Sequence, residues 1–166
     1  MKVIDNFLSD NAFAQLTQDI GVGSNMPWYP LQYVTRPNDG GFQLMHPFYS
    51  DNKPQSDWFD CLDIIIKKIS PAALLRIKAN ILTQRFHHVE HEMHTDMGDI
   101  GSSKVWTTGI FYMNTNNGYT KFEDGTKVES VENRMVMFDS NKPHCSVAQT
   151  DTPYRMVINF NWIGLY

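Results

Sequence analysis

The sequence predicts one mainly β domain with some helix (α+β), of the sandwich or barrel type, in which two helices cover one outer face. From residue 77 onward, short runs of β-branched and aromatic residues alternate with turn signals. Before that point, two segments place apolar residues at helical spacing. The 166 residues are 42% hydrophobic and 19% charged, which suits a single domain with its own core. We expect helical support at about 1–76 and the β core at about 77–162.

The first helix is expected at residues 9–20. Ser9 can cap it, and Gly21 and Gly23 end it. Its apolar stripe consists of Phe13, Leu16 and Ile20. Residues 24–55 are rich in proline, glycine and asparagine and predict loops with one short strand at 41–49.

A second, stronger helix is expected at residues 56–70. Ser56 can cap it and Pro71 stops it, with two lysines in the last turn. Its apolar stripe consists of Trp58 or Phe59, Leu62, Ile65, Ile66 and Ile69.

The β core is divided by recognisable turns at Asn117-Gly118, Asp124-Gly125 and Glu132-Asn133. The expected strands span residues 77–86, 104–114, 119–123, 126–131, 134–139, 144–149 and 154–162. This number of short strands favours a sandwich or a barrel.

The last of these strands has two different faces, because successive side chains of a strand point in opposite directions. The apolar face consists of Met156, Ile158, Phe160 and Trp162. It needs a hydrophobic cover, which a helix can supply. The polar face consists of Arg155, Val157, Asn159 and Asn161. It either faces water or lines a barrel cavity in which the arginine points at an anionic ligand.

The composition indicates which kinds of binding partner and which cellular compartment to expect. The net charge of −4 argues against a nucleic-acid partner. No apolar run approaches the roughly 20 residues that span a membrane, and the N-terminus lacks the apolar region of a signal peptide. We therefore expect a cytoplasmic protein (in the host cytoplasm, if phage-encoded) without a membrane partner. Cys61 and Cys145 are expected to be free thiols, and the oligomeric state is left open.

Four of the six histidines lie in the segment 85-RFHHVEHEMHTDMGD-99, which suggests a metal site. His94 and Asp96 are two residues apart, so in an extended segment both side chains can reach one ion. The zinc-protease pattern HExxH fails, because Thr95 stands where its second histidine is required. A third ligand should come from a distant strand, and the histidines outside the segment are His46 and His144.

Two histidines and one carboxylate leave metal positions open, as in the facial triad of non-haem Fe(II) oxygenases. Arg155 lies 11 residues beyond His144, and its planar fork suits a carboxylate. The series His94-Thr95-Asp96, His144, Arg155 resembles the HxD…H…R pattern of 2-oxoglutarate/Fe(II)-dependent oxygenases. Segments 110-IFYMN-114, 117-NGYTKFEDGTK-127 and 155-RMVINFNW-162 are similar to the prolyl 4-hydroxylase-like branch, in its small bacterial and phage form. The resemblance covers roughly residues 77–162.

The resemblance implies a double-stranded β-helix (distorted jelly roll) with Fe(II) held by His94, Asp96 and His144. It implies that 2-oxoglutarate chelates the iron and that Arg155 meets its 5-carboxylate. Further cofactor-binding residues implied by the resemblance are Tyr112, Asn80, Asn159 and Gln84. Of these, Gln84 stands where the family usually has a second tyrosine.

The implied activity is that of a dioxygenase, which uses O2 to convert 2-oxoglutarate to succinate and CO2 while hydroxylating an unactivated C–H. Ascorbate would support turnover. Asp96 fills the position that halogenating relatives leave for chloride, which favours hydroxylation.

The resemblance favours a prolyl residue of a protein or peptide as the substrate. A free amino acid, another small molecule or a nucleobase is the enzymatic alternative, and a metal-binding jelly roll without turnover is the non-enzymatic one. Nucleobase demethylases usually carry a second arginine where this chain has Asn161. The candidate substrate-binding residues are Trp106, Tyr33, Arg36 and His91.

Overall fold

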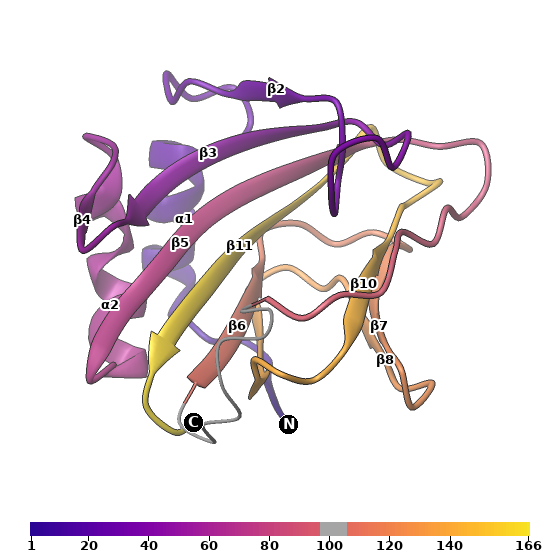
Figure 1. Ribbon diagram of the computed structural model, residues 1–166. Helices are drawn as coiled ribbons and strands as arrows, with labels where there is room; N and C mark the ends of the chain where they lie inside the picture. Colours follow the sequence, from indigo (N-terminus) through magenta and orange to yellow (C-terminus); the bar gives the residue numbers. More distant parts are fainter. Residues whose placement is uncertain (97–105) are drawn as a thin grey trace.

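The computed structural model describes residues 1–96 and 106–166, which form two antiparallel sheets and two helices (Figure 1). In the larger sheet the strand order is β1-β9-β6-β11-β5-β3-β2, and β4 pairs with β3. The smaller sheet has the order β10-β7-β8. The strands of the larger sheet are β1 (Lys2–Ile4), β2 (Tyr29–Leu31), β3 (Gln43–Ser50), β4 (Lys53–Pro54), β5 (Ala73–Thr83), β6 (Trp106–Tyr112), β9 (Arg134–Asp139) and β11 (Tyr154–Ile163). Those of the smaller sheet are β7 (Tyr119–Phe122), β8 (Lys127–Glu129) and β10 (His144–Val147). The arrangement is the predicted double-stranded β-helix.

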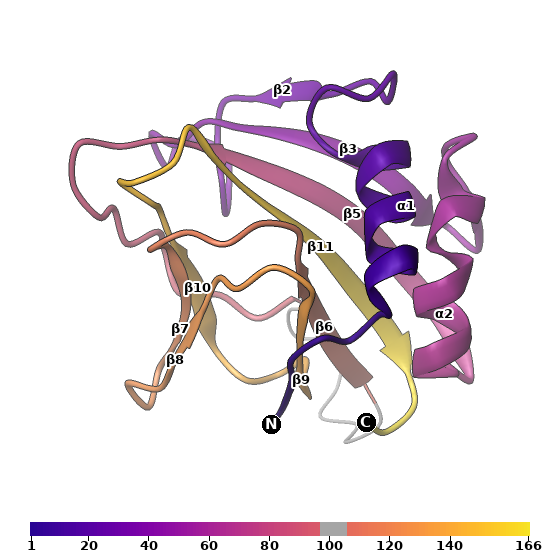
Figure 2. The same cartoon turned by 180° about the vertical axis from the view of Figure 1, so that it is seen from behind.

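Strand β11 lies in the middle of the larger sheet, between β5 and β6. Both of its faces are buried over most of its length. The apolar face packs beneath the helices α1 (Asp10–Ile20) and α2 (Asp63–Ile69), which lie together on one side of the sheet (Figure 2). The core there contains Leu16, Ile20, Leu62, Ile65, Met156, Ile158, Phe160 and Trp162. The predicted helical cover is confirmed, and burying each such side chain contributes about 1.5–3 kcal/mol.

The first helix begins as predicted, because the Ser9 hydroxyl accepts a hydrogen bond from the N–H of Ala12. The prediction of one continuous helix at 56–70 was wrong in its first half. The Ser56 hydroxyl accepts a hydrogen bond from the N–H of Trp58 and lies 2.7 Å from Nε2 of His46. A 3-10 helix, η1 (Phe59–Leu62), then precedes α2. Helix α2 ends at Ser70, whose φ of 47° is left-handed.

The first 76 residues contribute more than helical support. They supply β1 to β4 and the start of β5, which begins four residues earlier than predicted. Strands β1, β2 and β4 are too short to show a period of two in the sequence. The predicted strand at 104–114 is present as β6 from Trp106, and its first two residues lie outside the described residues. No helix in the described part of the chain combines the length and apolarity needed to cross a membrane.

Candidate metal centre and adjoining cavity

The two histidines that are 50 positions apart in the sequence are held side by side by the backbone. The N–H of His94 donates to the carbonyl of His144, and the N–H of His144 donates to the carbonyl of His94, each at 3.0 Å. This isolated antiparallel bridge joins the segment after β5 to the start of β10. The imidazole centroids are 4.7 Å apart.

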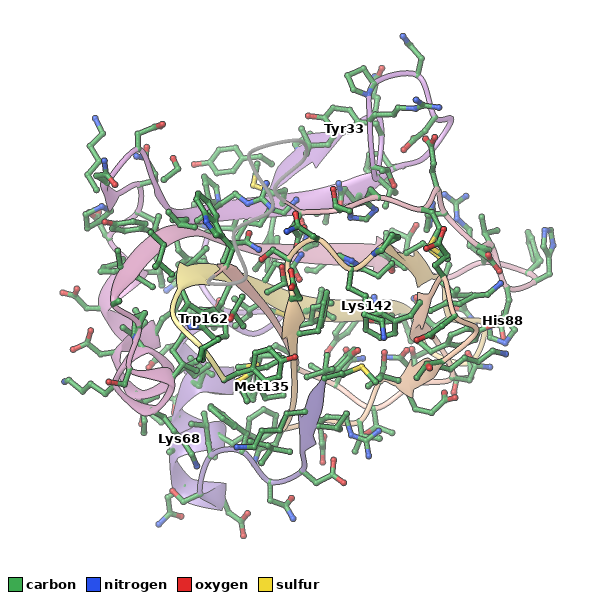
Figure 3. All side chains as sticks on the ribbon, turned by 60° about the horizontal axis from the view of Figure 1, so that its bottom comes forward. Tyr33, Lys68, His88, Met135, Lys142 and Trp162 are labelled. Carbon is green, nitrogen blue, oxygen red and sulfur yellow. The ribbon has the colours of Figure 1, made fainter. Side chains whose placement is uncertain are left out.

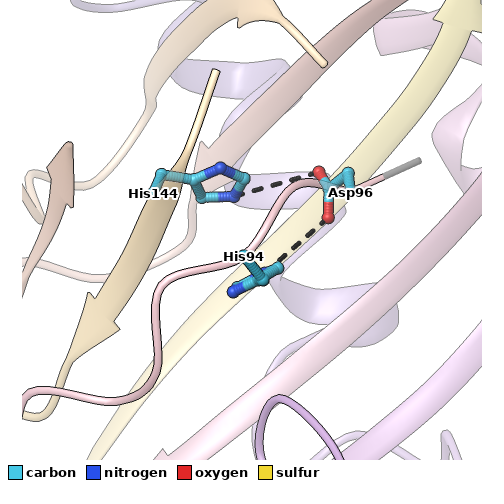
Figure 4. A group of neighbouring side chains, drawn as sticks. All are labelled: His94, Asp96 and His144. Atoms are coloured by element: carbon cyan, nitrogen blue, oxygen red, sulfur yellow. Dashed lines mark ion pairs between the residues drawn. The ribbon is translucent and has the colours of Figure 1, made fainter. Parts of the chain in front are cut away.

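Asp96 completes a compact group of three (Figure 4). One candidate ligand atom from each of His94, Asp96 and His144 lies within 4.8 Å of the other two. Nε2 of each histidine is 4.0 Å from an Asp96 carboxylate oxygen. The other distant histidine, His46, is already satisfied: Nδ1 lies 2.7 Å from the Pro27 carbonyl oxygen, and Nε2 lies 2.7 Å from Ser56 Oγ.

Three strands of the larger sheet fix the Asp96 carboxylate, whose side chain is only 3% exposed. Thr108 Oγ1 on β6 donates to it at 2.9 Å and Asn161 Nδ2 on β11 at 3.1 Å, while Arg76 Nη2 on β5 lies 3.3 Å away. Burial opposes ionisation, but His144, Arg76 and the Asn161 bond outweigh it and lower the pKa of Asp96 to about 2. The carboxylate is therefore charged and preoriented.

The same kind of support orients the imidazoles. Nδ1 of His94 is 3.1 Å from the Glu92 carbonyl oxygen, and Nδ1 of His144 is 3.1 Å from the Lys142 carbonyl oxygen. A carbonyl can only accept, so each Nδ1 carries the proton and each Nε2 presents a lone pair beside Asp96. Burial lowers the pKa of His144, which favours its neutral, metal-binding form. The donor set therefore fits a first-row divalent ion such as Fe(II), and nitrogen and oxygen ligands also suit its competitors.

A cavity between the two sheets opens beside His94 and His144. Its wall is formed by Val34, Gln43, Lys78, Asn80, Leu82, His94, Ile110, Thr120, His144, Cys145, Ser146, Arg155, Val157 and Asn159. The polar face of β11, which the sequence left open between water and a cavity, is buried and contributes three of these residues.

Arg155 is fully enclosed, with 2% of its surface exposed. Its guanidinium donates to hydroxyls alone: to Ser130 at 2.7 Å, Ser146 at 2.9 Å and Thr120 at 3.3 Å. Within residues 1–96 and 106–166 it has no carboxylate partner. A buried cation of this kind attracts an anionic ligand, because neutral hydroxyls leave its charge uncompensated.

Gly118 and Tyr112 shape the surroundings of Arg155. A Cβ on Gly118 would lie 2.8 Å from Arg155 Cδ, so this glycine makes room for the arginine. The Tyr112 hydroxyl donates to Thr120 at 2.8 Å, and the guanidinium lies 5.5 Å from the Tyr112 ring centroid. Tyr112 is therefore placed behind Thr120, outside the cavity wall.

The remaining cofactor candidates separate into two groups. Asn80 and Asn159 line the cavity, and the Oδ1 of each is buried without a hydrogen-bond partner in the described residues. Gln84 lies outside the cavity and is exposed, where its amide donates to the Thr150 carbonyl at 2.7 Å.

The sequence analysis did not identify three residues that contact Asp96 or line the cavity, namely Arg76, Lys78 and Thr108. The available signal was the period of two along a strand, which places Arg76 and Lys78 on the same face of β5 as Asn80, and Thr108 on the same face of β6 as Ile110.

The four candidate substrate-binding residues do not line the cavity. Arg36 is paired with Glu92 at 2.6 Å, and the backbone N–H of His91 donates to Ser146. Trp106 begins β6, and Tyr33 lies at the margin of the molecule near β2 (Figure 3). The extra histidine His88 also lies at the margin and bonds the Ala148 carbonyl (Figure 3).

No protein-family model and no curated protein sequence matches the chain. Solved structures do match it over nearly its whole length. A viral collagen prolyl hydroxylase from Paramecium bursaria chlorella virus 1, in complex with 2-oxoglutarate, has a TM-score of 0.59 at 13% identity, covering 99% of this chain and 96% of the other. A prolyl 4-hydroxylase from Pseudomonas putida has a TM-score of 0.62 at 12% identity, covering 99% and 92%. The α-ketoglutarate-dependent epimerase SnoN from nogalamycin biosynthesis has a TM-score of 0.68 at 9% identity, covering 98% and 75%. The chain has the fold of 2-oxoglutarate/Fe(II) oxygenases, as the sequence resemblance implied.

Proposed function

We propose that this protein is an Fe(II)- and 2-oxoglutarate-dependent dioxygenase that hydroxylates an unactivated C–H. One observation carries the proposal: the two histidines of the triad His94, Asp96 and His144 line a cavity in which the buried Arg155 has no carboxylate partner among the described residues. The triad fits Fe(II), and Arg155 fits a dicarboxylate that extends toward the triad.

Each group in the cavity then has a defined role. His94, Asp96 and His144 hold the iron, and the backbone bridge between the histidines keeps the two imidazoles in register. Arg155 binds the 5-carboxylate of 2-oxoglutarate, while Ser130, Ser146 and Thr120 hold its fork in place. Tyr112 acts through Thr120 as a positioning residue. When bound, Fe(II) with 2-oxoglutarate and O2 supplies the oxidising chemistry, which releases succinate and CO2.

For the substrate we propose a prolyl residue of a protein or peptide. The likeness to two prolyl hydroxylases supports this choice. The likeness to an epimerase from antibiotic biosynthesis supports a small molecule as the alternative. A role in metal binding without turnover would not explain why a buried arginine faces the cavity beside the metal ligands.

Anaerobic titration tests the co-substrate. Fe(II) followed by 2-oxoglutarate should give the visible charge-transfer band of the chelate with the wild-type protein. His94→Ala should abolish the band, and His88→Ala, a matched change at the margin of the molecule, should preserve it. If the wild-type protein gives no band, the proposed binding of 2-oxoglutarate to Fe(II) is refuted. A band without succinate release across peptides and amino acids would favour the module without turnover.

A further inference from the structure

A cluster of unsatisfied polar groups lies on the cavity wall at the level of the candidate metal centre. Lys78 is directly opposite Asn159 in the pairing of β5 with β11, and Asn80 is one same-face step further along β5. All three residues line the cavity. The ammonium of the half-buried Lys78 forms no ion pair with any described residue, and the Oδ1 atoms of both asparagines are buried without a donor. Two buried amide oxygens without a donor, beside an ammonium without an anionic partner, fit a polar ligand.

The charge of the cavity indicates an anionic ligand. Among the described residues, the cavity wall carries two cations, Lys78 and Arg155, and no carboxylate. Asp96 is paired with Arg76, so Lys78 and Arg155 remain uncompensated. In the proposed complex, Arg155 pairs with the 5-carboxylate of 2-oxoglutarate, and the other carboxylate together with Asp96 balances Fe(II), so the charge of Lys78 is left over. An excess of positive charge therefore remains for a second anionic molecule.

The strand register separates Lys78 from the arginine subsite. Arg155 pairs with Leu82, which lies four residues from Lys78 on the same face of β5. The Cα atoms of Lys78 and Leu82 are therefore about 13 Å apart, so Lys78 and Arg155 enter the cavity from separate levels of the two strands. Lys78 lines the cavity together with the candidate metal ligands His94 and His144.

We propose that Lys78, together with Asn80 and Asn159, forms a subsite for a carboxylate of the primary substrate. The ammonium of Lys78 pairs with the carboxylate, and the asparagine Oδ1 atoms accept from N–H groups next to it. A free amino acid or the C-terminal residue of a peptide offers both kinds of group. This inference rests on the proposed function, because the cavity must also hold Fe(II) and 2-oxoglutarate.

Matched acid and amide probes test the subsite. The anaerobic Fe(II)·2-oxoglutarate complex is titrated with L-proline against L-prolinamide, and with glycyl-L-proline against its C-terminal amide. Binding is followed by the change in the chelate band and by calorimetry. We expect at least one acid to bind about tenfold or more tightly than its amide. Lys78→Met should reduce the affinity for the acid to that for the amide, and Lys78→Arg should retain the preference. Lys67→Met, at an exposed lysine of α2, should change neither.

Two results would overturn the inference. If each acid binds wild-type protein with the same affinity as its amide, the cavity has no subsite for a substrate carboxylate. A Lys78→Met variant that loses 2-oxoglutarate affinity while keeping the acid-to-amide ratio assigns the lysine to the co-substrate. Both results require the chelate band, whereas its absence in wild-type protein refutes the proposed function itself.

Discussion

Replacing Lys78 by methionine should stabilise the protein in the absence of metal and ligands. Methionine has nearly the same length as the lysine stem and keeps its apolar contacts, while the buried charge is removed. No described residue forms an ion pair with Lys78, so the substitution leaves no partner behind.

The magnitude follows from the pKa of Lys78. Burial, and then the neighbouring Arg76, lower this pKa from 10.5 to about 8, and Asp96 only partly opposes them. Each pKa unit corresponds to about 1.4 kcal/mol, so the charged amine costs the folded state about 3 kcal/mol at most. The folded state binds this proton less tightly than the unfolded chain. The cost is therefore complete below pH 8 and disappears as the pH rises through 10.5.

Urea unfolding of the metal-free proteins measures this difference. At pH 6.5, Lys78→Met should unfold at a higher urea concentration than wild type with an unchanged slope, and the gap should narrow towards pH 10. Lys67→Met provides the comparison for a lysine on an exposed helix face. An unchanged or lower midpoint for Lys78→Met at pH 6.5 would refute the claim that this buried charge is uncompensated.

Three further predictions concern other parts of the structure. Arg155→Met should weaken 2-oxoglutarate binding by roughly 10- to 100-fold in anaerobic titration while Fe(II) binding persists, because charge-assisted bonds to the carboxylate are lost; unchanged affinity would mean that the anchor lies elsewhere. Gly109→Ala should lower the free energy of unfolding by about 1–3 kcal/mol in urea, because a Cβ would lie 2.8 Å from the ring of Trp162, and an unaltered midpoint would contradict this close packing. Asp39 accepts the backbone N–H groups of Val34, Thr35, Arg36 and Gly41, which overcome the opposing effect of burial and lower its pKa to about 2. Its contribution to stability should therefore be present above pH 4 and disappear as the pH falls towards 2, whereas Asp39→Asn should lack this acid dependence in unfolding measurements.

The strands and helices could be predicted from the sequence where buried and exposed side chains alternate with the regular period of a strand or a helix. β9 was predicted at its observed bounds, and β11 within one residue, because both are short stretches rich in apolar residues that turn signals separate from their neighbours. The two faces of β11 could also be distinguished by alternation. The triad could be located because His94 and Asp96 are neighbours in an extended segment.

The missing parts of the site depend on register between strands, which no local pattern encodes. Arg76 meets Asp96 only because β5 is aligned with β11 so that Arg76 lies opposite Asn161. Gln84, by contrast, was predicted to bind the cofactor but lies outside the cavity. Its spacing to His94 suggested a cofactor role, but β5 ends at Thr83, and the chain then leaves the sheet and turns Gln84 outward.

The three cations of β5 and β11 differ in their exposure and in their partners, since Arg155 is buried whereas Arg76 and Lys78 are half-buried. Arg76 is paired with Asp96 and so forms part of the support for a candidate metal ligand. Arg155 is buried among hydroxyls, which can orient its fork without neutralising it. The Lys78 ammonium has no carboxylate partner in the described residues, and burial lowers its pKa to about 8. Both unpaired cations face one cavity, at separate levels of the same two strands, so the arrangement is best explained by two carboxylate-bearing ligands that bind together.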